Sequence, residues 1–162
     1  MDTPTKEMHL KPLLYRFARV YALTSVILSA VGYLLDEYAD REIPSTVSAF
    51  TPFLVAIYST AQLFVKTYSR EITPDERVEL AKKSTLVLLL INLVFALIAL
   101  VAFIYSGELQ IETIRNPIMI GIAGLIIIFL LLVSYGLSWL FYPQAVRSLL
   151  KNIKPLNNTL PS

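Results

Sequence analysis

The sequence contains no cysteine and only one histidine, His9. The absence of cysteine excludes disulfide bonds, thiolate metal sites and cysteine catalysis. His9 lies in a polar N-terminal segment, and the sequence has no H-E-x-x-H, G-x-S-x-G or glycine-rich phosphate-binding motif. We therefore predict a protein that is not an enzyme and that binds no metal, cofactor or nucleic acid.

Charged residues are also scarce, at 16% of the sequence against 56% hydrophobic residues. They separate four uncharged runs: Val20 to Leu35, Ile43 to Val65, Ser84 to Gly107 and Asn116 to Val146. A helix needs about 20 residues to cross the hydrocarbon layer of a bilayer. Three runs are long enough. The first becomes so if its helix begins near Leu13, with the Arg16 and Arg19 side chains extending to the interface.

We predict helices because a backbone in lipid has to satisfy its own N–H and C=O groups, and no alternating barrel pattern is present. A soluble bundle is the alternative, but segments that are apolar on every side leave no face for water. The predicted fold is an all-α membrane protein, a four-transmembrane-helix bundle with spans at about 13–35, 47–68, 84–106 and 117–141. The first span also resembles a signal peptide, but no small-residue cleavage site follows Leu35, so we expect a retained anchor.

Lysine and arginine are divided unequally between the two predicted sides of the membrane. Twelve of them lie at one side: before span one or in its first turns, between the apolar parts of spans two and three, or after span four. Only Arg41 and Arg115 lie on the other side. The positive-inside rule then predicts that both termini and the loop 66–84 are cytoplasmic. We expect the basic residues to contact anionic lipids, so the inner leaflet of the bilayer is a predicted partner.

The loop 66–84 contains a helix start signal, Thr73-Pro74-Asp75-Glu76. Its Thr and Glu have the spacing of a capping box, in which each side chain accepts a hydrogen bond from the backbone of the other. Because no helix breaker follows before Gly107, span three is predicted to be one long helix with a cytoplasmic extension. A Glu79 to Lys83 pair, four residues apart, adds support to the exposed part of this helix.

The same stretch fits the pattern R-x-x-T-x-x-E-x-x-x-L-x-x-x-S through Arg70, Thr73, Glu76, Leu80 and Ser84. It resembles a family of short, uncharacterised, four-span bacterial inner-membrane proteins. The resemblance covers about Ala61 to Ser84, and Ile72 stands at a position where the family pattern has proline. It implies a bacterial inner membrane and a similar topology, but no activity.

Two prolines fall near predicted helix ends. Pro52 either kinks span two or begins it with Thr51 as N-cap, and we favour a helix that begins at Pro52. Pro143 is predicted to end span four, because the segment 143–154 has the apolar and basic spacing of a short amphipathic helix lying on the inner leaflet. Residues 1–154 are thus predicted to form a single transmembrane domain, and residues 155–162 a disordered tail.

The middles of the predicted spans contain no ionisable residue, which argues against ion-coupled transport. Asn92 is the most polar group at depth. It is predicted either to form a hydrogen bond between helices or to line a pore in an oligomer. Four pairs of small residues are predicted to let helices approach closely: Ser25 and Ser29, Ala56 and Thr60, Gly121 and Gly124, and Ser134 and Ser138.

These features favour a non-catalytic membrane protein with an interaction, regulatory or immunity-type role, acting through its helices and its cytoplasmic hairpin. The candidate interaction residues are Arg70, Thr73, Glu76, Lys82 and Lys83. The competing hypothesis is a small homo-oligomeric channel or a transport-associated subunit, in which Asn92 lines the pore. The predicted protein partner is accordingly another membrane protein or a further copy of this chain.

Overall fold

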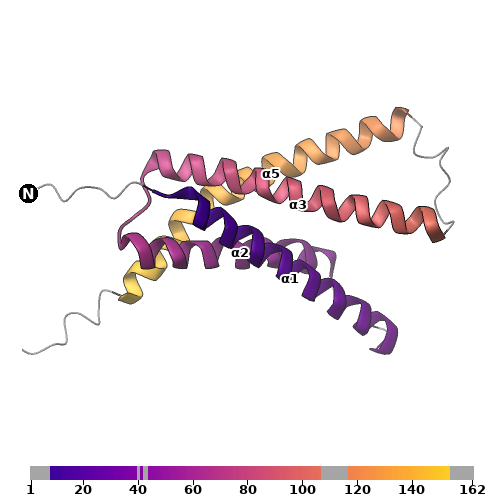
Figure 1. The fold of residues 1–162 in the computed structure, drawn as a ribbon, viewed down its shortest axis with the longest axis horizontal. Coiled ribbons are helices and arrows are strands. Elements are labelled where there is room, and N and C mark those ends of the chain that lie inside the picture. Colours follow the sequence, from indigo (N-terminus) through magenta and orange to yellow (C-terminus); the bar gives the residue numbers. More distant parts are fainter. Residues whose placement is uncertain (1–7, 40, 42–43, 107–116, 154–162) are drawn as a thin grey trace, which may run out of the picture.

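The structure is a computed structural model that describes residues 8–39, 41, 44–106 and 117–153. Within these ranges the chain forms four α-helices and no strand: α1 (Leu10–Ala39), α2 (Ser45–Tyr68), α3 (Pro74–Ser106) and α5 (Pro117–Ile153) (Figure 1). This confirms the all-helical prediction. The predicted disordered tail, residues 155–162, lies outside the described residues.

Three helical stretches are long and apolar enough to cross a membrane: Leu10–Ala39, Pro74–Ser106 and Gly124–Asn152. The structure therefore has the helices of a membrane protein. Helix α2 is not in this group, for which only the described residues count. Its assignment as a fourth span stays a prediction.

Each helix packs against two others: α1 and α5 both contact α2, and both contact α3. Figure 1 shows that they do not stay together along their whole length. The C-terminal half of α3 and the N-terminal half of α5 move apart from one another and from α1. The molecule consequently has two ends of different character.

Buried side chains gather at one end, which we call the packed end. It comprises residues 13–21 of α1, 53–65 of α2, 80–85 of α3 and 138–146 of α5. Phe17, Phe64 and Tyr142 are fully buried there. The ring of Phe17 stacks with that of Tyr21 at 6.1 Å between centroids and meets the ring of Phe53 edge-on at 6.4 Å. Interlocked aromatic side chains thus join α1 to α2.

The other end, which we call the open end, comprises residues 22–39 of α1, 86–106 of α3 and 121–137 of α5. Its large apolar side chains are mostly exposed: Leu125 is 69% exposed and Phe129 65%. Such exposure would be unfavourable in water, but lipid tails are as apolar as these side chains. The open end therefore has the surface of a membrane-embedded segment.

The structure corrects the interpretation of Pro52. The prediction that span two begins at Pro52 is wrong, because α2 begins at Ser45 and contains Pro52 in its interior. A proline inside a helix removes one intrahelical hydrogen bond, which packed neighbouring helices help a membrane helix to tolerate. The Pro52 side chain is buried within the helical assembly.

The interpretation of Pro143 is wrong as well. No break follows Tyr142, because α5 continues through Pro143 to Ile153. Val146, which was expected to lie on the leaflet surface, is fully buried in the packed end. The segment 143–153 is therefore the last part of α5 and belongs to the packed core, instead of forming a separate interfacial helix.

Candidate functional site

A five-residue turn, residues 69–73, joins α2 to α3. Ser69 has a φ of 52°, and its N–H donates to the Val65 carbonyl at 2.9 Å, which ends α2. At the start of α3, the Thr73 N–H donates to Glu76 Oε2 at 3.1 Å, and the Glu76 N–H donates to Thr73 Oγ1 at 3.4 Å. These two bonds confirm the predicted capping box, and α3 begins at Pro74 as predicted.

Arg70 closes this turn from the α2 side. Its two terminal nitrogens donate to the two carboxylate oxygens of Glu76 at 2.7 and 2.6 Å, and the guanidinium also lies over the rings of Phe64 and Tyr68. The hydrogen bonds from Arg70 lower the pKa of Glu76 below its ordinary value, against the opposing effect of burial. Two of the predicted interaction residues therefore bind each other across the turn.

The other two predicted interaction residues, Lys82 and Lys83, lie farther along α3 and do not join this cluster. Lys83 Nζ donates to Glu79 Oε1 at 2.8 Å, which confirms the predicted pair, although both side chains are about half exposed. Lys82 forms no ion pair with any residue in the described ranges. The structure thus separates the five candidates into a closed cluster, Arg70 with Thr73 and Glu76, and a basic pair.

A second link at the packed end joins α3 to α5 through Arg77. The Arg77 guanidinium lies over the Trp139 ring, 3.4 Å from its centroid, and Arg77 Nε donates to the Trp139 carbonyl at 2.5 Å. In a regular helix this carbonyl would accept from the N–H of residue 143, but that residue is proline and has no N–H. Arg77 therefore satisfies the carbonyl that Pro143 leaves without a helical donor.

Arg16 links α1 to α2 in the same way. Its Nε donates to the Ser59 carbonyl at 3.1 Å and to Ser59 Oγ at 2.9 Å. The Arg16 side chain is also exposed. Each of these arginines attaches one helix end to its neighbour, which makes the packed end a rigid base for the rest of the molecule.

Two of the hydroxyl side chains buried at the packed end, those of Thr60 and Ser84, bond within their own helices. Thr60 Oγ1 donates to the Ala56 carbonyl and Ser84 Oγ to the Leu80 carbonyl, each at 2.7 Å. The hydroxyls of Thr85 and Ser138, also buried, have no hydrogen-bond partner in the described part of the chain. Ala56 and Thr60 are fully buried, as expected for one of the predicted close-approach pairs.

The pair Gly121 and Gly124 behaves differently. A methyl group added at either position would meet no atom within 4 Å. These two glycines therefore do not bring helices of this chain together, because α5 is apart from its neighbours at the open end. A contact with a second chain through this pair stays a prediction. Ser134, from another predicted pair, also faces a cavity, and its partner Ser138 is fully buried.

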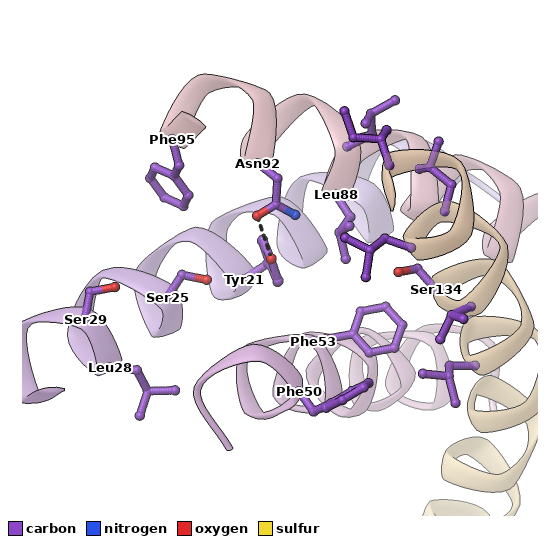
Figure 2. A pocket seen from close by; sticks show the side chains of 16 residues that line it. Tyr21, Ser25, Leu28, Ser29, Phe50, Phe53, Leu88, Asn92, Phe95 and Ser134 are labelled. Atoms are coloured by element: carbon purple, nitrogen blue, oxygen red, sulfur yellow. Dashed lines mark hydrogen bonds between the residues drawn. The ribbon is translucent and has the colours of Figure 1, made fainter. Parts of the chain in front are cut away.

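That cavity is a cleft of about 490 Å³ between all four helices, at the border of the packed and open ends. We call it the four-helix cleft (Figure 2). The polar side chains that line it are Tyr21, Ser25, Ser29, Asn92 and Ser134, and the remaining lining residues are apolar, such as Phe50, Phe53 and Phe95.

Asn92 carries the one hydrogen bond that the described side chains form across this cleft. The Tyr21 hydroxyl donates to Asn92 Oδ1 at 3.1 Å, which joins α1 to α3 and confirms the predicted interhelical bond. Figure 2 shows the amide nitrogen of Asn92 turned away from the Tyr21 hydroxyl. This nitrogen makes no hydrogen bond to a described residue, so its N–H groups are available to a ligand in the cleft.

The residues of the four-helix cleft have the chemistry of a binding site. Its polar groups are hydroxyls and one amide, and the cleft contains no carboxylate, imidazole or amine among its lining residues. Such a surface donates and accepts hydrogen bonds in an apolar setting, which suits binding better than acid–base catalysis. Comparisons with family models, curated proteins and solved structures found no match to this chain.

Sequence reasoning missed Tyr21, Arg77 and Trp139. Tyr21 lies in an apolar run, and nothing local distinguishes it from a membrane-facing tyrosine. The Arg77 link had a detectable signal, because a proline inside a membrane helix leaves the carbonyl four residues earlier without a donor. The prediction that span four ends at Pro143 leaves no place for this link.

Proposed function

We propose that this protein is a non-catalytic integral membrane protein that binds a transmembrane helix of another membrane protein in the four-helix cleft. In this proposal all four helices cross a bacterial inner membrane, and the packed end with both termini faces the cytoplasm. The role is regulatory or immunity-type, since a protein that holds a partner helix restrains what the partner does. The cleft between four helices, largely apolar but with hydroxyl and amide groups on its walls, carries the proposal.

The proposed orientation is supported by where the basic residues lie. The N-terminus of α1, the α2–α3 turn and the C-terminus of α5 all meet at the packed end, as the His9 N–H to Tyr68 hydroxyl bond and the Arg147–Glu71 ion pair illustrate. These segments carry nearly all of the described lysines and arginines, with Arg41 the exception. Positive residues concentrated at one end favour a cytoplasmic location for that end.

A helix is the favoured occupant because of the mixture of groups in the cleft. Apolar side chains gain little from leaving lipid for an apolar cleft, so close packing and hydrogen bonds have to supply the affinity. The hydroxyls of Ser25 and Ser29 and the amide of Asn92 lie on two helices that face the same space (Figure 2). They suit a partner helix with a small or polar residue at the matching depth.

The hairpin has a supporting role in this proposal. The bidentate pair between Arg70 and Glu76 and the capping box use the charges of the turn within the chain. We assign the turn to holding α2 and α3 in a fixed antiparallel arrangement, so that the cleft keeps its shape when empty. Lys82 and Lys83 are left for contacts outside the cleft.

The test is site-specific photo-crosslinking in intact cells. A photoreactive amino acid replaces Ser29, which lines the cleft, or Ile98 of α3, which is 61% exposed and outside it. We expect a discrete heterologous protein adduct from position 29 and lipid adducts alone from position 98. Adding Asn92→Leu should weaken the adduct at position 29. Identical adducts from both positions, or none at position 29, would contradict the proposal.

The homo-oligomeric channel is the second candidate, favoured by the polar Asn92 amide within the membrane-type part of α3. In that case position 29 should crosslink to a second copy of this chain, and the purified protein should conduct ions in planar bilayers. Asn92→Leu should then change the conductance. Silent bilayers from folded protein, together with a heterologous adduct, exclude the channel in favour of the helix-binding protein.

A further inference from the structure

A second cavity lies between α3 and α5, outside the four-helix cleft. This groove has a volume of about 700 Å³ and a polar mouth formed by Glu79, Lys82 and Lys83. Beyond the mouth its walls are apolar, with Leu86 on α3 and Leu132 on α5. Two further leucines, Leu89 and Leu131, line both the groove and the four-helix cleft, so α3 and α5 separate the two cavities.

The mouth of the groove carries a net positive charge. Lys83 is neutralised by Glu79 at 2.8 Å, whereas Lys82 forms no ion pair or hydrogen bond with any residue that the structure describes. One positive charge therefore remains at the point where the apolar walls begin. An anionic group seated there would be attracted to Lys82 and would also contact the partly exposed Lys83.

Thr85 is a further polar residue on the wall of the groove. It lines the groove about one helical turn below Lys82, is only 8% exposed, and its hydroxyl has no hydrogen-bond partner in the described part of the chain. Thr60 and Ser84 show the alternative, since their hydroxyls bond to carbonyls of their own helices. A buried hydroxyl without a partner is unfavourable. The Thr85 oxygen has almost no accessible surface as it stands, so an oxygen of a bound ligand would satisfy it after the side chain rotates about χ1.

The polar and apolar parts of the groove follow each other along α3. Glu79 and Leu89 are about 15 Å apart at the helical rise of 1.5 Å per residue. The groove presents first a cationic mouth, then the Thr85 hydroxyl, and then a hydrocarbon wall. A phospholipid has its parts in the same order: a phosphate, a glycerol ester and an acyl chain. We propose that the groove holds one anionic phospholipid, with its phosphate at Lys82 and Lys83 and an ester oxygen at Thr85. Basic pockets between membrane helices are known to bind such headgroups.

The proposal is tested by native mass spectrometry of the full chain in mild detergent. The protein is mixed with equal amounts of phosphatidylglycerol and phosphatidylcholine that have identical acyl chains. We expect one bound lipid per chain and a preference for phosphatidylglycerol. Lys82→Gln should reduce bound phosphatidylglycerol about fivefold. The matched variant Lys66→Gln removes an exposed lysine at the end of α2, outside the groove, and should leave binding unchanged.

Thr85→Val separates the two parts of the site. Because the ester oxygens are common to both lipids, this variant should weaken the binding of both and keep the preference for phosphatidylglycerol. Unchanged thermal unfolding of each variant shows that the fold is intact, and Thr85→Ser should restore binding if Thr85→Val misfolds. Equal binding of the two lipids, equal loss in Lys66→Gln, displacement by free glycerol phosphate, or a lipid-free dimer would each overturn the proposal.

Discussion

The packed end and the open end consist of the same helices, yet they are held in different ways. At the packed end, Phe17, Phe64 and Tyr142 are fully buried, and arginine side chains bond across from helix to helix. At the open end the apolar side chains face outward, and the Tyr21–Asn92 bond lies at its border. The difference shows that hydrophobic sequence does not by itself fix helices together where lipid is the solvent. Close packing of side chains and hydrogen bonds between helices hold them together.

The strongest test of this contrast replaces one phenylalanine at each end. Phe17→Ala leaves a cavity in the packed end and should lower the free energy of unfolding by about 3 kcal/mol or more. Phe129→Ala, at a side chain that is 65% exposed, should change it by less than about 0.5 kcal/mol. Unfolding in mixed micelles measures both. Equal losses would show that the two ends are packed alike.

The Arg70–Glu76 pair should have the next largest effect. Glu76→Gln removes a bidentate ion pair and weakens the capping box, and we expect a loss of about 1 to 2 kcal/mol. Its control is Glu79→Gln, which breaks the half-exposed pair with Lys83 and should cost less than about 0.5 kcal/mol. The same unfolding assay compares them, and a larger loss in Glu79→Gln would contradict the assignment of the turn.

The Arg70–Glu76 pair also predicts a pH dependence. The folded-state pKa of Glu76 is below its ordinary value of 4.5. Its contribution to stability is therefore complete above pH 4.5 and is lost as the pH falls through the lower, folded-state value. Acid unfolding of the native protein should show this loss, and Glu76→Gln should remove that part of the profile. A profile unchanged by the substitution would mean that other carboxyl groups control acid stability.

Substitutions of Arg77 and Pro143 test the bond from Arg77 to the Trp139 carbonyl. Arg77→Ala should cost about 1 kcal/mol, because it leaves the Trp139 carbonyl without a donor. In a Pro143→Ala background the helix regains its own N–H at residue 143, so the same Arg77→Ala change should cost less. A double-mutant cycle measures this coupling. Additive losses would show that the two residues act independently.

The smallest effect is expected at the border of the two ends. Asn92→Leu removes the hydrogen bond to Tyr21 and should cost about 0.6 kcal/mol. Tyr21→Phe, which deletes the same bond from the other side, should have a similar effect, and the double variant should add little more. A loss of several kcal/mol at Asn92 would mean that the open end depends on this contact far more than its exposure suggests.

Local sequence signals were sufficient to predict a helix end where side chains of nearby residues form the cap. Thr73, Pro74 and Glu76 specify the start of α3 within one turn, so this start was predictable to the residue. The effect of the two prolines on their helices was not predictable from local signals. Whether Pro52 and Pro143 end a helix or lie inside it depends on what neighbouring helices offer the freed carbonyl groups, and those neighbours are distant in sequence.

The candidate site was predictable in its parts but not as an assembly. The depth of Asn92 in α3 and the lack of ionisable groups near it indicated an interhelical hydrogen bond. Its partner, Tyr21, lies 71 residues away, and no local pattern relates the two. The cleft itself arises because the helices diverge, and divergence depends on how α1, α2, α3 and α5 pack together at the other end.

The turn at residues 69–73 also bears on how a protease would meet the chain. It lies between Lys66 and Arg77 and contains Arg70, so it offers trypsin its preferred residues. A protease, however, requires an extended segment that it can draw into its active site. The left-handed Ser69, the mutual bonds of Thr73 and Glu76 and the clamp by Arg70 hold this segment in a folded shape. We therefore expect trypsin to cleave slowly at Arg70 as long as this short connection stays folded.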